Sequence, residues 1–255
     1  MGRALGTVYG VAVYAFFFAT FLYAIGFVGN LVVPKGIDLG EEGALAISLL
    51  INMGLLVIFA LQHNVMARPW FKAAWTKVVP KQLERSMFVL LASAALAFMF
   101  WQWRPLTGVI WEVENAAIAN TLVGVSLLGW GLVLFATFLI DHFDLFGLRQ
   151  TFMWDRYTKP IFKEASLYRH VRHPLYLGFL IAFWATPAMT VGHLFFAVVT
   201  TAFILWSIQF EEHDLANEHA EYRVYQKRVP MLLPTGRTEP SEPSTTPTPT
   251  EAEPT

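Results

Sequence analysis

The sequence predicts an all-α integral membrane protein with about six transmembrane helices. Its 255 residues are 55% hydrophobic and only 15% charged, whereas soluble domains average about 25% charged residues. Five intervals of 31, 25, 18, 26 and 38 residues contain no Asp, Glu, Lys or Arg. Because a membrane-spanning helix needs about 20 apolar residues, these intervals suffice for several spans and leave little chain for a soluble domain.

The first four intervals each predict one helix, near residues 8–33, 44–66, 86–103 and 117–142. The fifth would form about 57 Å of helix, nearly twice the thickness of the hydrocarbon core. Thr186-Pro187 and the following Thr190-Val191-Gly192-His193 stretch provide a break in its middle. We therefore expect two short helices in a tight hairpin, 175–189 and 193–210.

The distribution of Lys and Arg predicts the orientation. In a six-crossing arrangement, 16 of the 18 positive charges fall on one side, in loops 67–85, 143–174 and 211–237 and at the amino terminus. The other side carries only Lys35 and Arg104. The positive-inside rule makes the basic side cytoplasmic, with both termini on it.

Charge and cysteine content exclude several function classes. A net charge of −1 gives no basis for binding nucleic acid. The absence of cysteine excludes disulfides, thiolate metal sites and cysteine nucleophiles. The first apolar stretch is too long for a cleaved signal peptide and lacks a clear small-residue cleavage site.

The chain divides into three predicted parts. Residues 1–142 supply helices one to four, and 143–237 supply a loop, the helical hairpin and a carboxy-terminal helix. Residues 238–255 contain five Pro, four Glu and six Thr. Such a segment cannot bury a core, so we expect a disordered tail.

Polar residues gather at the predicted cytoplasmic ends of the helices, where function is best sought because polar groups are costly in a membrane. The four clusters are Gln62-His63-Asn64, Asp141-His142-Phe143-Asp144, the segment 168–176, and Glu211-Glu212-His213-Asp214. We expect these clusters to converge on one cytoplasmic-side cavity.

The segment before the hairpin, residues 172–174, has the features of a helix start. Pro174 fits the first turn, where its missing N–H costs nothing. This leaves Arg172 and His173 directing donors toward an anion, and Arg suits a carboxylate through two parallel hydrogen bonds. A basic flank of an ordinary helix explains the same residues equally well.

The last helix gathers acids on one face. Glu211, Asp214 and Glu218 follow i, i+3, i+7 spacing. A solvated helix end is the plainer explanation. The proximity of a basic, aromatic-rich segment favours instead a polar ligand that bears both charge signs.

The cluster of His63, Asp141 and His142 allows several interpretations: a proton relay, a metal site or a helix end facing water. Two histidines and one carboxylate are a known metal-ligand set, but here the ligands would have to meet across helices, and we expect no metal. A buried, hydrogen-bonded His63 with a structural role stays open.

The carboxy-terminal motifs resemble those of a known enzyme superfamily. RHPLYLG at 172–178, EE at 211–212 and YRVYQKRVPMLLP at 222–234 resemble the isoprenylcysteine carboxyl methyltransferase superfamily, over roughly residues 165–234. One departure is Ser-Leu-Tyr at 166–168, where that superfamily commonly has Gly-Pro-Tyr.

The amino-terminal half narrows the resemblance. LQHNVMARPWFKAAWTKVVPKQLERSMFVL at 61–90, FWQWRP at 100–105 and DHFDLFGLRQ at 141–150 are similar to the bacterial methanethiol S-methyltransferases. This resemblance implies an enzyme of the bacterial cytoplasmic membrane that methylates a small thiol, methanethiol, to dimethyl sulfide with S-adenosylmethionine. It implies the lipid bilayer as surroundings and no obligatory protein partner.

The resemblance also implies a cofactor pocket on the cytoplasmic side. The expected cofactor-binding residues are Tyr168, Arg172, His173, Tyr176, Glu211, Glu212, Arg223 and Arg228. The arginines suit the carboxylate of S-adenosylmethionine, and a glutamate suits its ribose hydroxyls or ammonium. Aromatic faces near its sulfonium would add about 0.5–2 kcal/mol of cation–π stabilisation.

Methyl transfer of this kind is a single in-line displacement that needs alignment and exclusion of water rather than a covalent enzyme intermediate. The thiol must lose its proton, and a cysteine thiol titrates near about 8.5, so a base would help. His63, Asp141 and His142 are the candidate catalytic residues.

Other functions stay open at this point. The acceptor could instead be a prenylcysteine carboxylate, a phospholipid amine or another thiol. A sterol-reductase-like oxidoreductase using a nicotinamide cofactor shares the carboxy-terminal resemblance. A non-catalytic membrane protein that handles heme or ions through His63 and His142 is the remaining alternative.

Overall fold

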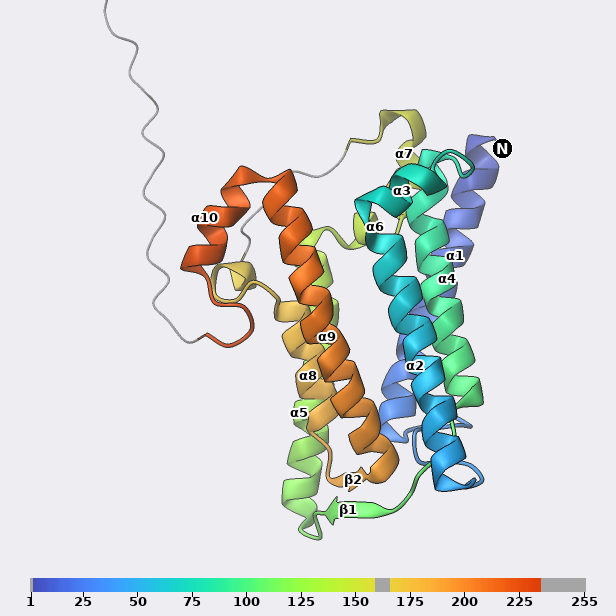
Figure 1. The fold of residues 1–255 in the computed structure, drawn as a ribbon, viewed down its shortest axis with the longest axis vertical. Helices are drawn as coiled ribbons and strands as arrows, with labels where there is room; N and C mark the ends of the chain where they lie inside the picture. The colour runs from blue at the N-terminus through green and yellow to red at the C-terminus, as the bar shows by residue number, and fades with distance from the viewer. Residues whose placement is uncertain (1, 159–165, 235–255) are drawn as a thin grey trace, which may run out of the picture.

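The chain folds into a bundle of long helices that run up and down along a common direction (Figure 1). The structure, a computed structural model, describes residues 2–158 and 166–234. Its long helices are α1 (Arg3–Gly29), α2 (Leu45–Ala67), α4 (Lys81–Gln102), α5 (Ala116–Ile140) and α9 (Val191–Glu218). Among the described residues, these five are long and apolar enough to cross a membrane. The all-α membrane fold is thus confirmed, while the predicted tail at 238–255 lies outside the described residues.

The helix boundaries follow local signals. Each of the first four predicted spans matches a long helix to within about five residues at its start and four at its end. Helix α4 begins earlier than its apolar interval, directly after Pro80, because the charged turn from Lys81 to Arg85 continues the helix beyond the membrane part. Asn115 starts α5 by accepting hydrogen bonds from two backbone N–H groups of its first turn.

The predicted hairpin is present, with limbs of unequal length. Helix α8 (Pro174–Trp184) has only 11 residues, about 16 Å, which is half the hydrocarbon thickness. Helix α8 ends at Trp184, three residues before Pro187, which has no backbone N–H to continue the helical hydrogen bonds. Thr190 then caps α9, its hydroxyl accepting from the His193 N–H at 3.0 Å. Thus α8 is shorter than expected, and α9 continues past residue 210 to Glu218.

Two short strands close the lower end of the bundle in Figure 1. Strands β1 (Val109–Glu112) and β2 (Ala188–Thr190) pair antiparallel, which the sequence analysis did not anticipate. The side chain of Asn52 donates to and accepts from the backbone of Arg104, at 2.8 and 2.9 Å. We call this region, β1 and β2 with the Asn52–Arg104 pair, the sheet end.

The opposite end, which we call the polar end, carries short helices. They are α3 (Pro69–Trp75), α6 (His142–Leu145), α7 (Leu148–Met153), η1 (Trp154–Arg156), η2 (Ser166–Arg169) and α10 (Ala220–Arg228). The amino terminus lies at this end too (Figure 1). The described parts of the three basic loops therefore fall on one side of the bundle, as the charge distribution predicts; which side of a membrane this is stays a prediction.

Glycines set the closest helix contact, between α5 and α8. A Cβ atom added to Gly178 would lie 2.8 Å from the Gly129 carbonyl oxygen and 2.8 Å from the Val133 nitrogen. Only glycine permits this approach, and small residues play this part widely in membrane helix pairs. The start of α8, and with it the segment around Arg172, is thereby seated against α5.

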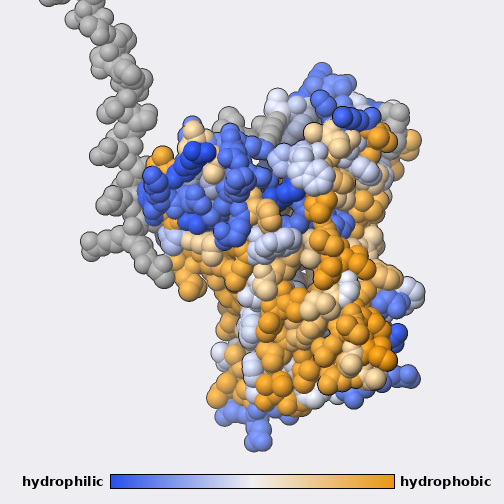
Figure 2. Space-filling view, in the orientation of Figure 1, coloured by the Kyte–Doolittle hydropathy of each residue, from blue (hydrophilic) through white to orange (hydrophobic). Residues whose placement is uncertain are grey.

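The surface agrees with a membrane environment. On the face shown in Figure 2, a broad hydrophobic band covers the middle of the molecule, and hydrophilic residues gather at its two ends. Large apolar side chains lie exposed on the long helices, Leu50 at 73% and Leu128 at 74%. Contiguous apolar surface of this kind needs lipid or another apolar partner.

Candidate functional site

The polar end brings together most of the residues that the sequence singled out. The carboxyl ends of α2 and α9, the first turns of α4 and α8, and helix α6 all reach this end (Figure 1). The predicted clusters therefore lie at one end of the bundle, while their convergence on one cavity stays a prediction. The cofactor pocket itself stays a prediction, because the geometry of the helix ends alone places these residues together, and two cavities among the described residues are lined by other residues.

Glu212 is the centre of a buried ionic network. Its Oε1 atom accepts from Arg172 Nε at 2.7 Å and from His173 Nε2 at 2.9 Å. Its Oε2 atom accepts from Gln226 Nε2 at 2.7 Å. The side chains of Arg172 and Glu212 are 10% and 8% exposed. Such burial is tolerated only when each charge is paired and hydrogen-bonded, so this network fixes its members in place.

Arg172 also fastens the carboxy-terminal segment to the start of α8. Its Nη1 atom donates to the carbonyl oxygens of Gln226 and Val229. The backbone N–H groups of Arg172 and His173 donate to the carbonyls of Pro230 and Met231, at 2.9 and 3.1 Å. The Nε and Nη1 atoms of Arg172 are thus directed to protein acceptors.

Glu211, one residue earlier, has a different environment. The Tyr176 hydroxyl donates to its Oε2 atom at 2.9 Å, the one hydrogen bond of this side chain in the described structure. Burial raises the pKa of the Tyr168 phenol, and the nearby Glu211 charge raises it further. The Tyr168 carbonyl accepts from the Tyr225 hydroxyl at 2.5 Å. Of the paired glutamates, Glu211 therefore keeps more capacity to accept from a ligand.

Arg85 is a half-buried cation that was not among the predicted site residues. It lies in the first turns of α4, where its Nε donates to the Leu145 carbonyl at 2.7 Å and its guanidinium lies 4.9 Å from the Phe88 ring centre. The acidic groups of Asp144 and Glu211 act on it electrostatically. Its position as the last charge before an 18-residue apolar interval was the available signal.

Asp144 and Tyr157 add two perturbed groups beside Arg85. Burial raises the pKa of the Asp144 carboxyl. Burial, followed by the nearby Asp144, raises the pKa of Tyr157 to about 12. The Asp144 Oδ1 atom is buried and has no hydrogen-bond partner among the described residues. Perturbed groups of this kind are concentrated at functional sites.

Among the described residues, the adjacent Asp141 and His142 make their side-chain contacts with residues other than His63. The Nε2 atom of His142 lies 2.7 Å from the Tyr14 hydroxyl, and its Nδ1 lies 2.7 Å from the Thr137 hydroxyl. The ring stacks on Phe138 at 4.1 Å. Asp141 pairs with Arg149 and accepts from the backbone N–H of α6. These two residues are therefore engaged in holding α5, α6 and α1 together.

His63 is placed differently. Its ring lies between Phe59 and Phe88, at centroid distances of 5.4 and 5.1 Å. Its Nδ1 atom is buried and has no hydrogen-bond partner in the described part of the chain. Arg85 and Arg68 are the charges that act on it. His63 thus shares one neighbouring cation, Arg85, with Glu211.

The two remaining cofactor candidates lie on α10. Arg223 is exposed, and its Nε donates to the Ala216 carbonyl at 3.1 Å. Arg228 is half-buried in the last turn of the helix. Among the described residues, no three His, Asp or Glu side chains are grouped as a metal site requires.

Comparison with known proteins identifies relatives along nearly the whole chain. It is 54% identical to methanethiol S-methyltransferase 1 of Bradyrhizobium diazoefficiens over 91% of this chain and 83% of the relative. It is 49% identical to the methanethiol S-methyltransferase of Crocosphaera subtropica, over 92% and 93%. Its identity to that of Mycobacterium tuberculosis is 50%, over 92% and 98%. No family model and no solved structure matches the chain.

Proposed function

Because the chain belongs to the methanethiol S-methyltransferase family, we propose that it methylates methanethiol to dimethyl sulfide with S-adenosylmethionine as the methyl donor. The observation that carries this proposal is the sequence identity of 49–54% to three relatives of that name, over 91–92% of this chain. Those names favour neither the oxidoreductase nor the heme-binding alternative.

The residues at the polar end fit such a donor. S-adenosylmethionine presents an ammonium and ribose hydroxyls, which need acceptors, and a carboxylate, which needs a cation. Glu211 and the unpartnered Oδ1 of Asp144 are acceptors, and Arg85 lies within electrostatic reach of both carboxyl groups. When bound, the donor supplies an electrophilic methyl group on a sulfonium.

The chain's own part in cofactor binding is orientation. Tyr176 holds Glu211 by its hydroxyl, so that the carboxylate keeps one direction. The Glu212 network holds Arg172 and His173 at the start of α8, which positions Tyr176. Arrangement of the donor and acceptor for in-line attack is the main source of rate in a displacement of this kind. Arg223 and Arg228 remain candidates for the donor's carboxylate.

We place the removal of the thiol proton at His63. Its Nδ1 atom is unpartnered among the described residues, so it can accept a hydrogen bond from the thiol. The proton passes through His63 to water at the polar end, and the neighbouring Arg85 and Arg68 charges stabilise the thiolate that is left. Asp141 and His142 hold the surrounding helices through Arg149 and Tyr14. They support the base rather than act as the base.

The proposed location is the bacterial cytoplasmic membrane, with the polar end and both termini on the cytoplasmic side. The relatives are bacterial, and the basic loops gather at the polar end. S-adenosylmethionine is charged and water-soluble, so a site at this end receives it directly from the cytoplasm.

The test uses the full chain purified in detergent and incubated with S-adenosylmethionine and methanethiol, with headspace dimethyl sulfide as the readout. Three variants divide the roles. Glu211→Gln is expected to weaken S-adenosylmethionine binding, and His63→Ala to lower kcat without weakening it. His142→Ala is the matched histidine control and is expected to lower stability more than kcat.

Each outcome has a distinct meaning. Wild-type protein that binds S-adenosylmethionine but forms no dimethyl sulfide rejects methanethiol as the acceptor. A folded preparation that does not bind S-adenosylmethionine rejects methyl transfer. Unchanged turnover in His63→Ala places proton removal elsewhere.

A further inference from the structure

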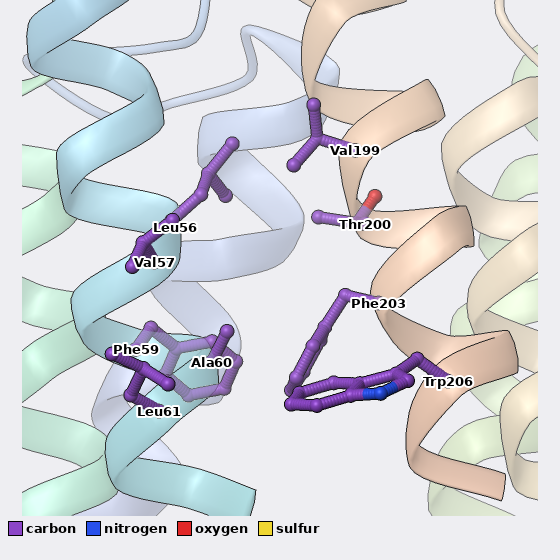
Figure 3. Close-up of a pocket in the computed structure, with 9 residues that line it drawn as sticks. All are labelled: Leu56, Val57, Phe59, Ala60, Leu61, Val199, Thr200, Phe203 and Trp206. Atoms are coloured by element: carbon purple, nitrogen blue, oxygen red, sulfur yellow. The ribbon is translucent and has the colours of Figure 1, made fainter. Parts of the chain in front are cut away.

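An apolar groove lies between α2 and α9, halfway along the bundle (Figure 3). It encloses a cavity of about 220 Å³. Its described lining residues are Leu56, Val57, Phe59, Ala60, Leu61, Val199, Thr200, Phe203 and Trp206. None of these is charged, and the Thr200 hydroxyl is already used, donating to the Phe196 carbonyl at 2.6 Å. The groove therefore offers contact to apolar molecules and no site for an ion.

The groove is open to the outer surface of the bundle. Val57, Leu61 and Trp206, which form its rim, are 42%, 52% and 47% exposed. Both helices belong to the hydrophobic band, since each is long and hydrophobic enough to span a membrane. The opening thus faces the hydrocarbon region rather than water.

The inner wall of the groove is shared with the functional site. The ring of Phe59 lies 6.2 Å from that of Phe203 across the groove and 5.4 Å from that of His63 on its other side. Closer to the polar end, Asn64 donates to the Ser207 hydroxyl at 2.9 Å and ties the two helices together. Phe59 therefore belongs to the groove lining and also contacts the unpartnered His63.

We propose that this groove admits methanethiol from the bilayer to His63. The inference rests on the proposed function and adds the route and binding surface of its acceptor. Methanethiol is small, neutral and apolar when protonated, so an uncharged lining suits the thiol and excludes its thiolate. The thiol then loses its proton only at the inner end, through His63 to water at the polar end, beside the Arg68 and Arg85 charges that act on His63 and would stabilise the thiolate.

The test compares two neighbouring residues of α9 in the full-length enzyme reconstituted in lipid nanodiscs. Val199→Trp fills the groove, whereas Val198→Trp places the same side chain on the outer surface, because Val198 is 49% exposed and does not line the cavity. We expect Val199→Trp to raise the KM for methanethiol about tenfold, leaving kcat at saturating thiol and the Kd for S-adenosylmethionine unchanged. Val198→Trp should match the wild type.

A second variant tests the groove in the opposite direction. Phe203→Ala widens it, and we expect kcat/KM for 1-butanethiol relative to methanethiol to rise about tenfold, as it does when a hydrophobic pocket gains space for methylene groups.

Two results would overturn the inference while the enzyme remains active: equal KM values for the two tryptophan variants, or a lower thermal stability of Val199→Trp with an unchanged KM. The second would assign the groove to a lipid acyl chain. Wild-type protein in nanodiscs that forms no dimethyl sulfide would instead reject the proposed function, and this inference with it.

Discussion

Replacing Glu212 by Gln tests the buried network with almost no change in side-chain size. Two donors, from Arg172 and His173, converge on Oε1, and a third, from Gln226, meets Oε2. A Gln side chain has one acceptor oxygen and one NH2 group. With its oxygen at the Oε1 position it satisfies Arg172 and His173, but its NH2 then faces the Gln226 NH2 unless that amide turns over as well. In either orientation the buried Arg172 charge loses its counter-charge.

The expected cost is large for one substitution. Removing one partner of a buried ion pair costs about 3–5 kcal/mol. Because Arg172 keeps the carbonyls of Gln226 and Val229 as acceptors, we take the lower limit, about 3 kcal/mol. In a chain of this size 1 kcal/mol shifts the melting temperature by about 2–4 °C, so Glu212→Gln should melt about 6–12 °C below the wild type.

Glu211→Gln is the matched control, one residue away on the same helix. The amide oxygen can still accept from Tyr176, so we expect a loss of at most about 1 kcal/mol. Melting is followed by intrinsic fluorescence in detergent, at one scan rate for all samples. Glu212 would not be the structural anchor if the two variants melted within about 2 °C of each other, or if Glu211→Gln melted lower.

Three further predictions concern the helix contacts and the polar end. A Cβ at Gly129 would lie 2.7 Å from the Ala182 nitrogen, whereas Gly131 faces open space; Gly129→Ala should lose about 1–3 kcal/mol of stability and Gly131→Ala almost none, as thermal melts would show. Tyr14→Phe removes a partner of His142 and should cost about 1–3 kcal/mol with kcat for methanethiol unchanged; a selective loss of kcat would give this contact a part in the chemistry. Burial raises the pKa of Asp144 above its value in the unfolded chain, so the folded protein loses stability as the pH rises and this carboxyl ionises. Asp144→Asn should therefore melt above the wild type at pH of about 8, and the difference should vanish toward pH of about 4. A constant difference across this range would contradict the prediction.

The sequence predicted what depends on local composition. Uncharged intervals predicted the long helices because each span needs its own apolar residues, whatever lies beside it. The break between α8 and α9 was predictable in the same way, because Pro187 interrupts a helix and Thr190 caps the next one through local backbone effects. The gathering of His63 and Glu211 at one end follows from helix direction alone.

The sequence did not predict contacts that depend on how distant segments meet. The pairing of β1 with β2 joins residues about 80 positions apart, and neither strand has a strong pattern of its own. The separate environments of Glu211 and Glu212 depend on α10 folding back to bring Gln226 to Oε2. In the sequence Arg85 resembled an ordinary helix flank, because its distinguishing contacts, with Phe88 and the Leu145 carbonyl, form only on folding.

The sheet end also determines where the bundle can move. There the backbone of β2 is bonded to β1, and the Thr190 hydroxyl donates to Asp38, so α9 is anchored at its first residue. With 28 residues, α9 acts as a lever about 42 Å long, on which a tilt of about 5° displaces the far tip by about 4 Å. The same rotation moves the anchored base hardly at all. A tilt of this size would have to break the Glu212 network and the Arg68–Asp214 ion pair near the tip, whereas the strand pairing at the sheet end would survive it.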